Sequence, residues 1–160
     1  ETYRVAFRGV LPDAHLDGLT VDSRAETWEQ RMASTESKRH HCFVADSELG
    51  IVGFVAVART RDDDQKSVGE VVAIYTHPDQ WNRGIGRKLM SRAIASLRHL
   101  GHVQASLWTF EGAKRARRFY ETGGWRFDGS TKVLELGLPV VLVRYRLDLS
   151  KDEGKVASKV

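Results

Sequence analysis

A strand, a glycine turn and a long helix follow one another without interruption, and this order limits the folds open to the chain. Residues 70–76 (EVVAIYT) are apolar on both faces, as in a central strand of a sheet that is covered on both sides. From residue 84 the apolar residues recur at helical spacing, and a further strand is predicted over 103–109. A strand, a helix and a strand in this order place the two strands in parallel with a right-handed crossover. The helical stripe consists of Ile85, Leu89, Ala93, Ile94, Leu97 and Leu100.

The segments on either side of this unit predict a mixed sheet. Strands are expected over 4–11, 125–128 and 140–149, and residues 41–45 and 51–59 form a hairpin around a turn at 47–50. Helices are expected from Pro12-Asp13, with Asp13 as the cap, over 22–34 and over 112–122. The hairpins add antiparallel pairs to the parallel unit. We therefore expect an α+β (mixed α/β) architecture with helices on both faces of the sheet.

The composition is that of an ordinary globular protein with one domain. The chain has 160 residues, of which 41% are hydrophobic and 29% are charged. Residues 1–149 are expected to form the domain, and the polar residues 150–160 a disordered tail. No apolar run approaches the ~20 residues that span a bilayer, and no leader pattern is present, so we expect no membrane partner. The single cysteine, Cys42, is expected in the core and favours a reducing, cytoplasmic compartment.

The turn between the central strand and the long helix is suited to an anionic group. The first backbone N–H groups of a helix have no internal partner, and the helix dipole adds positive charge there. Gly84 and Gly86 let the backbone approach a bulky anion, and Arg83, Arg87 and Lys88 surround it with positive charge. This arrangement predicts a diphosphate cradle. The alternative is a plain strand-to-helix turn whose glycines satisfy only geometry.

Two other phosphate motifs are absent. A Walker-type loop requires G-x-x-x-x-G-K-[ST], which the chain lacks. A dinucleotide fingerprint requires a third glycine, where this chain has Leu89, and an acidic residue at the end of the next strand, which instead ends in Leu107-Trp108-Thr109.

Three ordered motifs resemble those of the GNAT superfamily of N-acetyltransferases, over roughly residues 4–149. Residues 78–89 (PDQWNRGIGRKL) resemble its acetyl-CoA loop, Q/R-x-x-G-x-G/A, and residues 70–78 its central strand. Residues 112–125 (GAKRARRFYETGGW) resemble its later helix, N-x-x-A-x-x-F-Y-E-x-x-G-[FW]. The resemblance implies the GNAT fold, with a mostly antiparallel, twisted sheet of six to seven strands. It also implies acetyl-CoA as cosubstrate and direct acetyl transfer to a primary amine in a ternary complex.

The resemblance also implies the residues that contact the cosubstrate. They are Ile74, Tyr75, Thr76, Trp81, Asn82, Arg83, Gly84, Ile85, Gly86, Arg87, Ala113 and Tyr120. Two positions depart from the pattern. Trp81 replaces the usual Gln or Arg, a replacement familiar in this superfamily. Ala113 replaces an Asn, which puts one side-chain hydrogen bond to the cofactor arm in doubt but not the fold.

Acetyl transfer to an amine requires a base for the ammonium, a donor to the thioester carbonyl and a proton for the leaving thiolate. The resemblance makes Tyr120 the acid that protonates the thiolate, and the backbone N–H of Ile74 the donor to the carbonyl. Glu70 is the candidate base, since it opens the central strand where relatives place a glutamate. The alternatives are that Tyr120 is a core aromatic and that Glu70 is a solvated carboxylate at a strand end. A covalent route through Cys42 is disfavoured because this residue lies outside the three motifs.

Several charged or metal-binding residue types have simpler interpretations. The basic run Lys114–Arg118 is either a solvated face or a contact for the ribose phosphate, and without interleaved aromatics it gives little support to nucleic-acid binding. His40-His41 has no second pair at ligand spacing, so no metal is expected. His77 is interpreted as a turn residue, and Asp62-Asp63-Asp64 as an exposed hairpin tip.

The acceptor and the oligomeric state are left open. In this superfamily the acceptor site is shaped by the segment between the first two helices, here about 18–40, and by a late loop, here about 128–139. Neither contains a readable code, and a homodimer is compatible with the sequence. A non-catalytic CoA-binding domain is the principal alternative function, and a nucleic-acid-binding module a weaker one.

Overall fold

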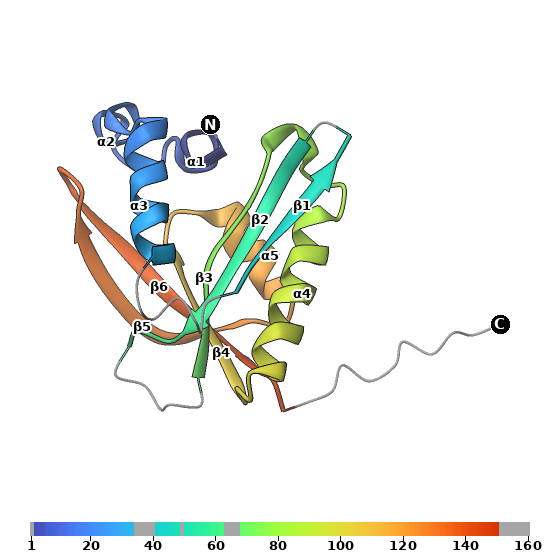
Figure 1. Ribbon diagram of the computed structural model, residues 1–160. Coiled ribbons are helices and arrows are strands. Elements are labelled where there is room, and N and C mark those ends of the chain that lie inside the picture. The colour runs from blue at the N-terminus through green and yellow to red at the C-terminus, as the bar shows by residue number, and fades with distance from the viewer. Residues whose placement is uncertain (1, 34–40, 49, 63–67, 151–160) are drawn as a thin grey trace.

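A computed structural model describes residues 2–33, 41–48, 50–62 and 68–150. The elements are α1 (Thr2–Phe7), α2 (Asp13–Gly18), α3 (Val21–Ala33), β1 (His41–Ser47), β2 (Gly50–Arg59), β3 (Val68–Thr76), the 3-10 helix η2 (Pro78–Gln80), α4 (Ile85–His99), β4 (Gln104–Phe110), α5 (Lys114–Thr122), β5 (Arg126–Glu135) and β6 (Pro139–Asp148) (Figure 1). No helix in these ranges is long and apolar enough to cross a membrane.

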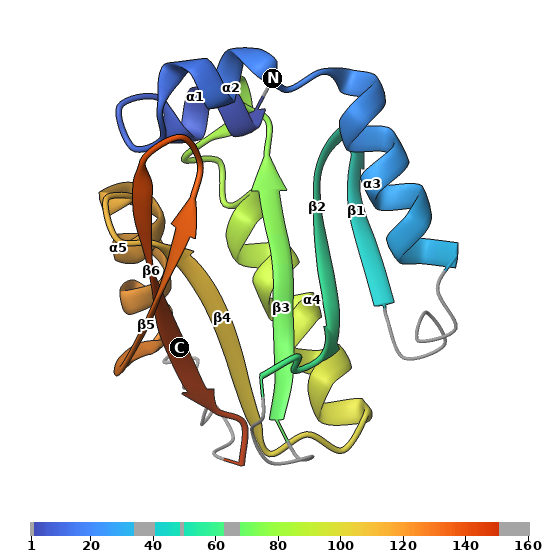
Figure 2. The ribbon, with the colours of Figure 1, turned by 90° about the vertical axis from the view of Figure 1, so that its left-hand side faces the viewer.

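The strands form one mixed sheet with helices on both faces, as predicted. Its six strands lie in the order β1-β2-β3-β4-β6-β5. β3 and β4 are parallel, as expected for the strand-helix-strand unit, and the other neighbours are antiparallel. Figures 1 and 2 show α4 and α5 on one face and the amino-terminal helices α1 to α3 on the other.

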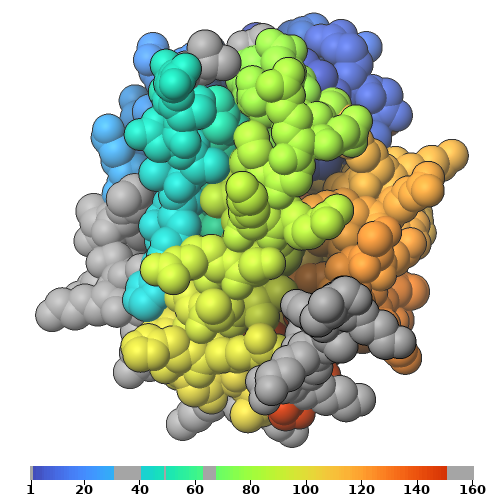
Figure 3. Space-filling view, turned by 90° about the vertical axis from the view of Figure 1, so that its right-hand side faces the viewer, coloured from blue at the N-terminus to red at the C-terminus, as the bar shows by residue number. Residues whose placement is uncertain are grey.

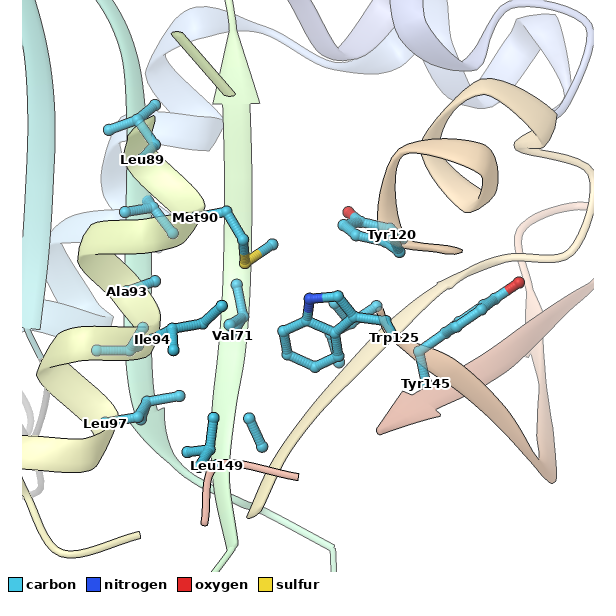
Figure 4. Close-up of a cluster of buried hydrophobic side chains, with 14 of the residues drawn as sticks. Val71, Leu89, Met90, Ala93, Ile94, Leu97, Tyr120, Trp125, Tyr145 and Leu149 are labelled. Carbon is cyan, nitrogen blue, oxygen red and sulfur yellow. The ribbon is translucent and has the colours of Figure 1, made fainter. Parts of the chain in front are cut away.

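Each face of the sheet has its own hydrophobic cluster. The larger one joins α4 and α5 to the sheet and includes Leu89, Leu97, Tyr120, Trp125 and Tyr145 (Figure 4). The smaller one lies under α1 and α2 and includes Phe7, Leu16 and Phe110. The sheet therefore lies between two separate layers of helices and packs against both.

The first predicted strand, over 4–11, is wrong, because this segment begins with helix α1 and continues into a turn. Tyr3, Phe7 and Leu11 recur every four residues and all join the smaller cluster, which is helical spacing and not strand alternation. The predicted cap is also wrong. Pro12 occupies the N-cap of α2 without a side-chain hydrogen bond, and Asp13 lies inside the first turn.

The late loop expected over 128–139 is wrong as well, because β5 continues to Glu135. This strand lies at the edge of the sheet and nearly all of its residues are exposed, so it lacks the buried alternation by which a strand is recognised. Two core assignments also fail. Cys42 is exposed on β1, and Leu100 is 38% exposed just beyond α4. The predicted tail falls almost entirely on residues 151–160, outside the described ranges.

A hydrogen-bonded carboxylate connects β5 to β6. Asp128 accepts bonds of 2.7 Å from the Nε atoms of both Arg144 and Arg146, and one of 2.9 Å from the backbone N–H of Ser130. Burial by itself would raise the pKa of the Asp128 carboxyl. The bonds from Ser130, Arg146 and Arg144 outweigh burial and lower this pKa to about 2.

We predict that Asp128→Asn lowers the free energy of unfolding at neutral pH by about 2 kcal/mol. The folded-state pKa lies below that of an unfolded aspartate, so this contribution is complete above pH ~4 and is lost as the pH falls toward 2. Denaturant unfolding of parent and variant from pH 7 to pH 2 measures it. The two curves should converge in acid, and equal stability at pH 7 would contradict the prediction.

Candidate active site

Strands β3 and β4 lie side by side at their amino-terminal ends and then separate. Their register begins at Val68↔Gln104 and ends with its third pair, Glu70↔Ser106, and no further pair follows within the described strands. β3 also carries a bulge, since its register with β2 skips Val72. Figure 2 shows the two strands diverging toward their carboxyl ends. The facing edges of separated strands offer backbone N–H and C=O groups to an extended ligand.

The turn after β3 leaves the amino-terminal end of α4 open. Gly84 is the N-cap residue and has the left-handed φ of 79°, which favours glycine, and no side chain caps the helix. A Cβ at Gly84 would meet no other group within 4 Å. A Cβ at Gly86 would meet nothing nearer than the Phe119 ring at 3.6 Å, which is ordinary contact. No group of the described protein therefore crowds the Cβ position of either glycine.

Three positively charged side chains surround this turn, and no acidic side chain of the described residues pairs with them. Arg83, Arg87 and Lys88 are exposed, and none of them forms an ion pair within the described part of the chain. Figure 3 shows the surface hollowed between the lime-green residues at the start of α4 and the orange residues of α5. An anion placed there meets both the helix dipole and three side-chain cations.

Both the indole N–H and the ring face of Trp81 contact other protein groups. Its Nε1 donates a 2.9 Å hydrogen bond to the carbonyl of Thr76, and the Arg115 guanidinium lies 3.5 Å from the centre of its ring. The side chain that departs from the family loop thus ties the turn to the end of β3 and to α5. Within the predicted basic run, Arg117 also has an internal role, because its Nε donates to the Tyr145 hydroxyl at 2.9 Å.

The predicted cosubstrate contacts all lie around the diverging ends of β3 and β4. The structure places Ile74, Tyr75 and Thr76 at the end of β3, Trp81 to Gly84 in the turn, Ile85, Gly86 and Arg87 in the first turn of α4, Ala113 at the N-cap of α5 and Tyr120 within α5. Ala113 is buried and makes no side-chain hydrogen bond at the start of α5.

Tyr120 lies on the buried face of α5. Only 9% of the residue is exposed, and its hydroxyl has no hydrogen-bond partner among the described residues. Burial above all, and then the nearby phenol of Tyr75, raise the pKa of Tyr120. The phenol therefore keeps its proton at neutral pH, and this proton is not committed to another protein group.

Glu70 faces the opposite side of the sheet from Tyr120. A Cβ at Gly69 would strike Leu97 of α4, and Val71 packs in the same cluster, so the residue between them points away from α4. Glu70 is only 2% exposed, which rules out the solvated strand end considered above. Its oxygens accept bonds from Arg61, at 2.7 Å from Nη2, 3.3 Å from Nε and 3.2 Å from the backbone N–H.

A second polar group on the Glu70 side escaped the sequence analysis. The Trp108 Nε1 donates a 2.8 Å bond to Asp62, whose carboxylate also accepts from Arg144 at 3.2 Å, and Lys132 Nζ lies 3.8 Å from the Trp108 ring centre. The Asp62 side chain is 23% exposed, so it is no exposed hairpin tip. Asp63 and Asp64 lie outside the described residues. The partners are far apart in sequence, so no local pattern indicates them.

The two histidine positions have structural roles. His41 bonds Ser96 of α4 at 2.7 Å, and His77 caps η2, where its Nδ1 accepts from the Asp79 N–H. His40 lies outside the described residues. Within residues 2–33, 41–48, 50–62 and 68–150, no group of three or more His, Cys, Asp and Glu side chains could hold a metal.

Comparison with known proteins agrees with this geometry. A family model described as the acetyltransferase (GNAT) family matches residues 9–125. The uncharacterized N-acetyltransferase YuaI of Bacillus subtilis is 25% identical over 112 residues, which are 69% of this chain and 61% of that protein. A mycothiol acetyltransferase of Propionibacterium freudenreichii is 31% identical over 102 residues, which are 63% of this chain and 32% of that protein. The matches thus span less than two thirds of these relatives.

A solved structure extends the likeness to the fold. The PaiA N-acetyltransferase of Thermoplasma acidophilum, crystallised in complex with coenzyme A, has a TM-score of 0.71 to this chain at 13% identity. The superposition covers 92% of this chain and 86% of that one. At this identity the likeness concerns the architecture alone.

We predict that Gly86→Val weakens CoA binding at least ~100-fold, because a branched side chain would occupy the space beside the helix amides. Gly86→Ala is the matched control, since its methyl group fits beside Phe119 and the family pattern accepts alanine there. Calorimetric titration with CoA measures the affinity, and melting curves show whether each variant is folded. Parent-like affinity in folded Gly86→Val would place the diphosphate elsewhere.

Proposed function

The chain belongs to the acetyltransferase (GNAT) family, and on that premise we propose that it binds acetyl-CoA and transfers the acetyl group directly to an amine held in the same complex. One observation carries the proposal: the open amino-terminal end of α4 adjoins the diverging edges of β3 and β4. A molecule with a diphosphate followed by an extended amide-containing arm is complementary to both features at once.

The residues present fit such a cosubstrate. The diphosphate is assigned to the backbone amides that follow Gly84, with Arg83, Arg87 and Lys88 as counter-charges. The arm is assigned to the edge of β3 that has no partner among the described strands beyond Glu70, where its amides can pair with the backbone as an added strand would. Acetyl-CoA supplies the activated thioester, and the remaining chemistry consists of positioning and proton transfer.

On the α5 side, we assign Tyr120 the role of acid. The carbon–sulfur bond breaks with its electron pair on sulfur, and the Tyr120 hydroxyl gives its proton to that sulfur. Burial keeps the phenol protonated, and the same apolar surroundings raise the proton affinity of a thiolate that forms beside it. The backbone N–H of Ile74, just beyond the bulge in β3, is assigned to the thioester carbonyl.

On the opposite side, Glu70 is assigned the role of base that takes the proton of the acceptor ammonium, directly or through water. Arg61 covers its carboxylate and must move aside first. The Arg61 side chain is 60% exposed, so it can swing into solvent without breaking a packed core. In this assignment Glu70 acts on the amine from one face of the sheet and Tyr120 acts on the sulfur from the other, where β3 and β4 separate.

The amine itself is best found by a screen. Amines, aminoglycosides, polyamines and peptides are offered with acetyl-CoA, and release of the free thiol is followed. The proposal expects turnover with at least one class. Tight CoA binding without turnover across all classes would favour the non-catalytic CoA-binding alternative.

We predict that Tyr120→Phe lowers kcat roughly 10²–10⁴-fold, because it removes a general acid. CoA affinity should stay near that of the parent, since the ring and its packing remain. Steady-state rates with an acceptor from the screen, calorimetry with CoA and a melting curve are compared on the same protein. Turnover within about threefold of the parent would make Tyr120 a core aromatic only.

We further predict that Glu70→Gln lowers turnover near neutral pH and that the loss shrinks as the pH approaches the acceptor's own pKa, because the amine then deprotonates in water. Glutamine preserves an oxygen acceptor for Arg61, so the variant tests the base more than the fold. The pH profile of kcat/KM is the measurement. A pH-independent deficit would show that Glu70 only anchors Arg61.

A further inference from the structure

One buried donor in the core has no partner. The residue Trp125 is 2% exposed, and its indole Nε1 is the single buried side-chain nitrogen or oxygen that lacks a hydrogen bond within the described part of the chain. Leaving such a group unsatisfied costs about 1–3 kcal/mol, so it needs an explanation. A phenylalanine would fill most of the same space without that cost.

This orphan donor lies beside the proposed acid. The Trp125 and Tyr120 rings are 6.5 Å apart between centroids in an edge-to-face arrangement. In Figure 4 the indole nitrogen and the Tyr120 hydroxyl oxygen both lie on the side of their rings that faces Met90, in the space between α4 and α5 next to β3. Neither atom has a hydrogen-bond partner among the described residues. Two donors without acceptors therefore lie on the same side of this apolar cluster.

The chemistry of the pair restricts what can occupy that place. An indole N–H donates and cannot accept, and the neighbours Val71 and Met90 offer no strong acceptor. An electron-rich atom that enters from outside would satisfy the free donor. The anionic sulfur that forms when a thioester is cleaved is such an atom, and it gains most from a hydrogen bond where water is excluded.

We propose that Trp125 is a further catalytic residue, whose indole N–H donates a hydrogen bond to the sulfur of the cosubstrate. This inference rests on the function proposed above. During transfer the neutral amine nitrogen bonds to the acetyl carbon and releases one N–H proton to water, the carbon–sulfur electron pair passes to sulfur, and Tyr120 supplies the proton that the sulfur takes up. Trp125 retains its own proton and stabilises the anion until that transfer occurs.

The test follows the indole N–H resonances of the parent protein labelled with ¹⁵N. The chain has four tryptophans, so the spectrum is simple. Trp125→Phe assigns the resonance, and Phe variants of the other three tryptophans assign it by elimination if that variant does not fold. Trp81, in the turn before α4, reports cosubstrate binding independently. The ligands are CoA and desulfo-CoA, which differ only in the sulfur.

We expect both ligands to shift the Trp81 resonance, and only CoA to move the Trp125 N–H downfield and slow its exchange with solvent. If both ligands shift the Trp81 resonance and the Trp125 resonance is identical in the two complexes, the inference is overturned and the proposed function stands. An ordered water bound to the indole N–H would give this result. No response of any resonance to either ligand would overturn both.

Discussion

The short parallel contact between β3 and β4 is the constraint on which the rest of the molecule depends. It ends at Glu70↔Ser106, and the bulge at Val72 follows directly. Because the strands part there, the sheet has an interior edge with backbone groups available. The side chains of α4 and α5 pack against one face of the sheet where the two strands separate. The glycine turn that leads from β3 into α4 lies beside the unpaired edge of β3. One local break in pairing thus leaves an unpaired edge of β3 beside the uncapped start of α4.

The divergence also separates the two proton transfers. Tyr120 and Trp125 belong to the apolar layer under α4 and α5, where burial holds a phenol in its protonated form and leaves an indole donor unsatisfied. Glu70 belongs to the other face, where Arg61 covers it and where Trp108 donates a hydrogen bond to Asp62. In our proposal the acid and the base cannot neutralise each other, because the sheet lies between them.

Local signals predicted the elements that build the cradle. The apolar stripe of α4, the glycine turn and the parallel crossover are all encoded within residues 68–110, and they are found as expected. Elements that are exposed or near a chain end are harder to predict from the sequence. The segment of α1 also alternates loosely between polar and apolar residues, which is typical of a strand, and the exposed edge strand β5 lacks the buried face that would indicate its full length. The Glu70–Arg61 pair and the orphan nitrogen of Trp125 arise from packing, which a single sequence does not reveal.

In our proposal the arm of acetyl-CoA lies along the edge of β3 that has no partner among the described strands. Amide hydrogen exchange over residues 71–76, with and without saturating acetyl-CoA, tests it most directly, with the pairing of β1 and β2 as internal reference. We predict that exchange in 71–76 slows on binding, because new hydrogen bonds form on that edge, while the reference stays unchanged. Unaltered amide exchange over residues 71–76, in protein that calorimetry shows to be saturated with acetyl-CoA, would contradict this placement of the arm.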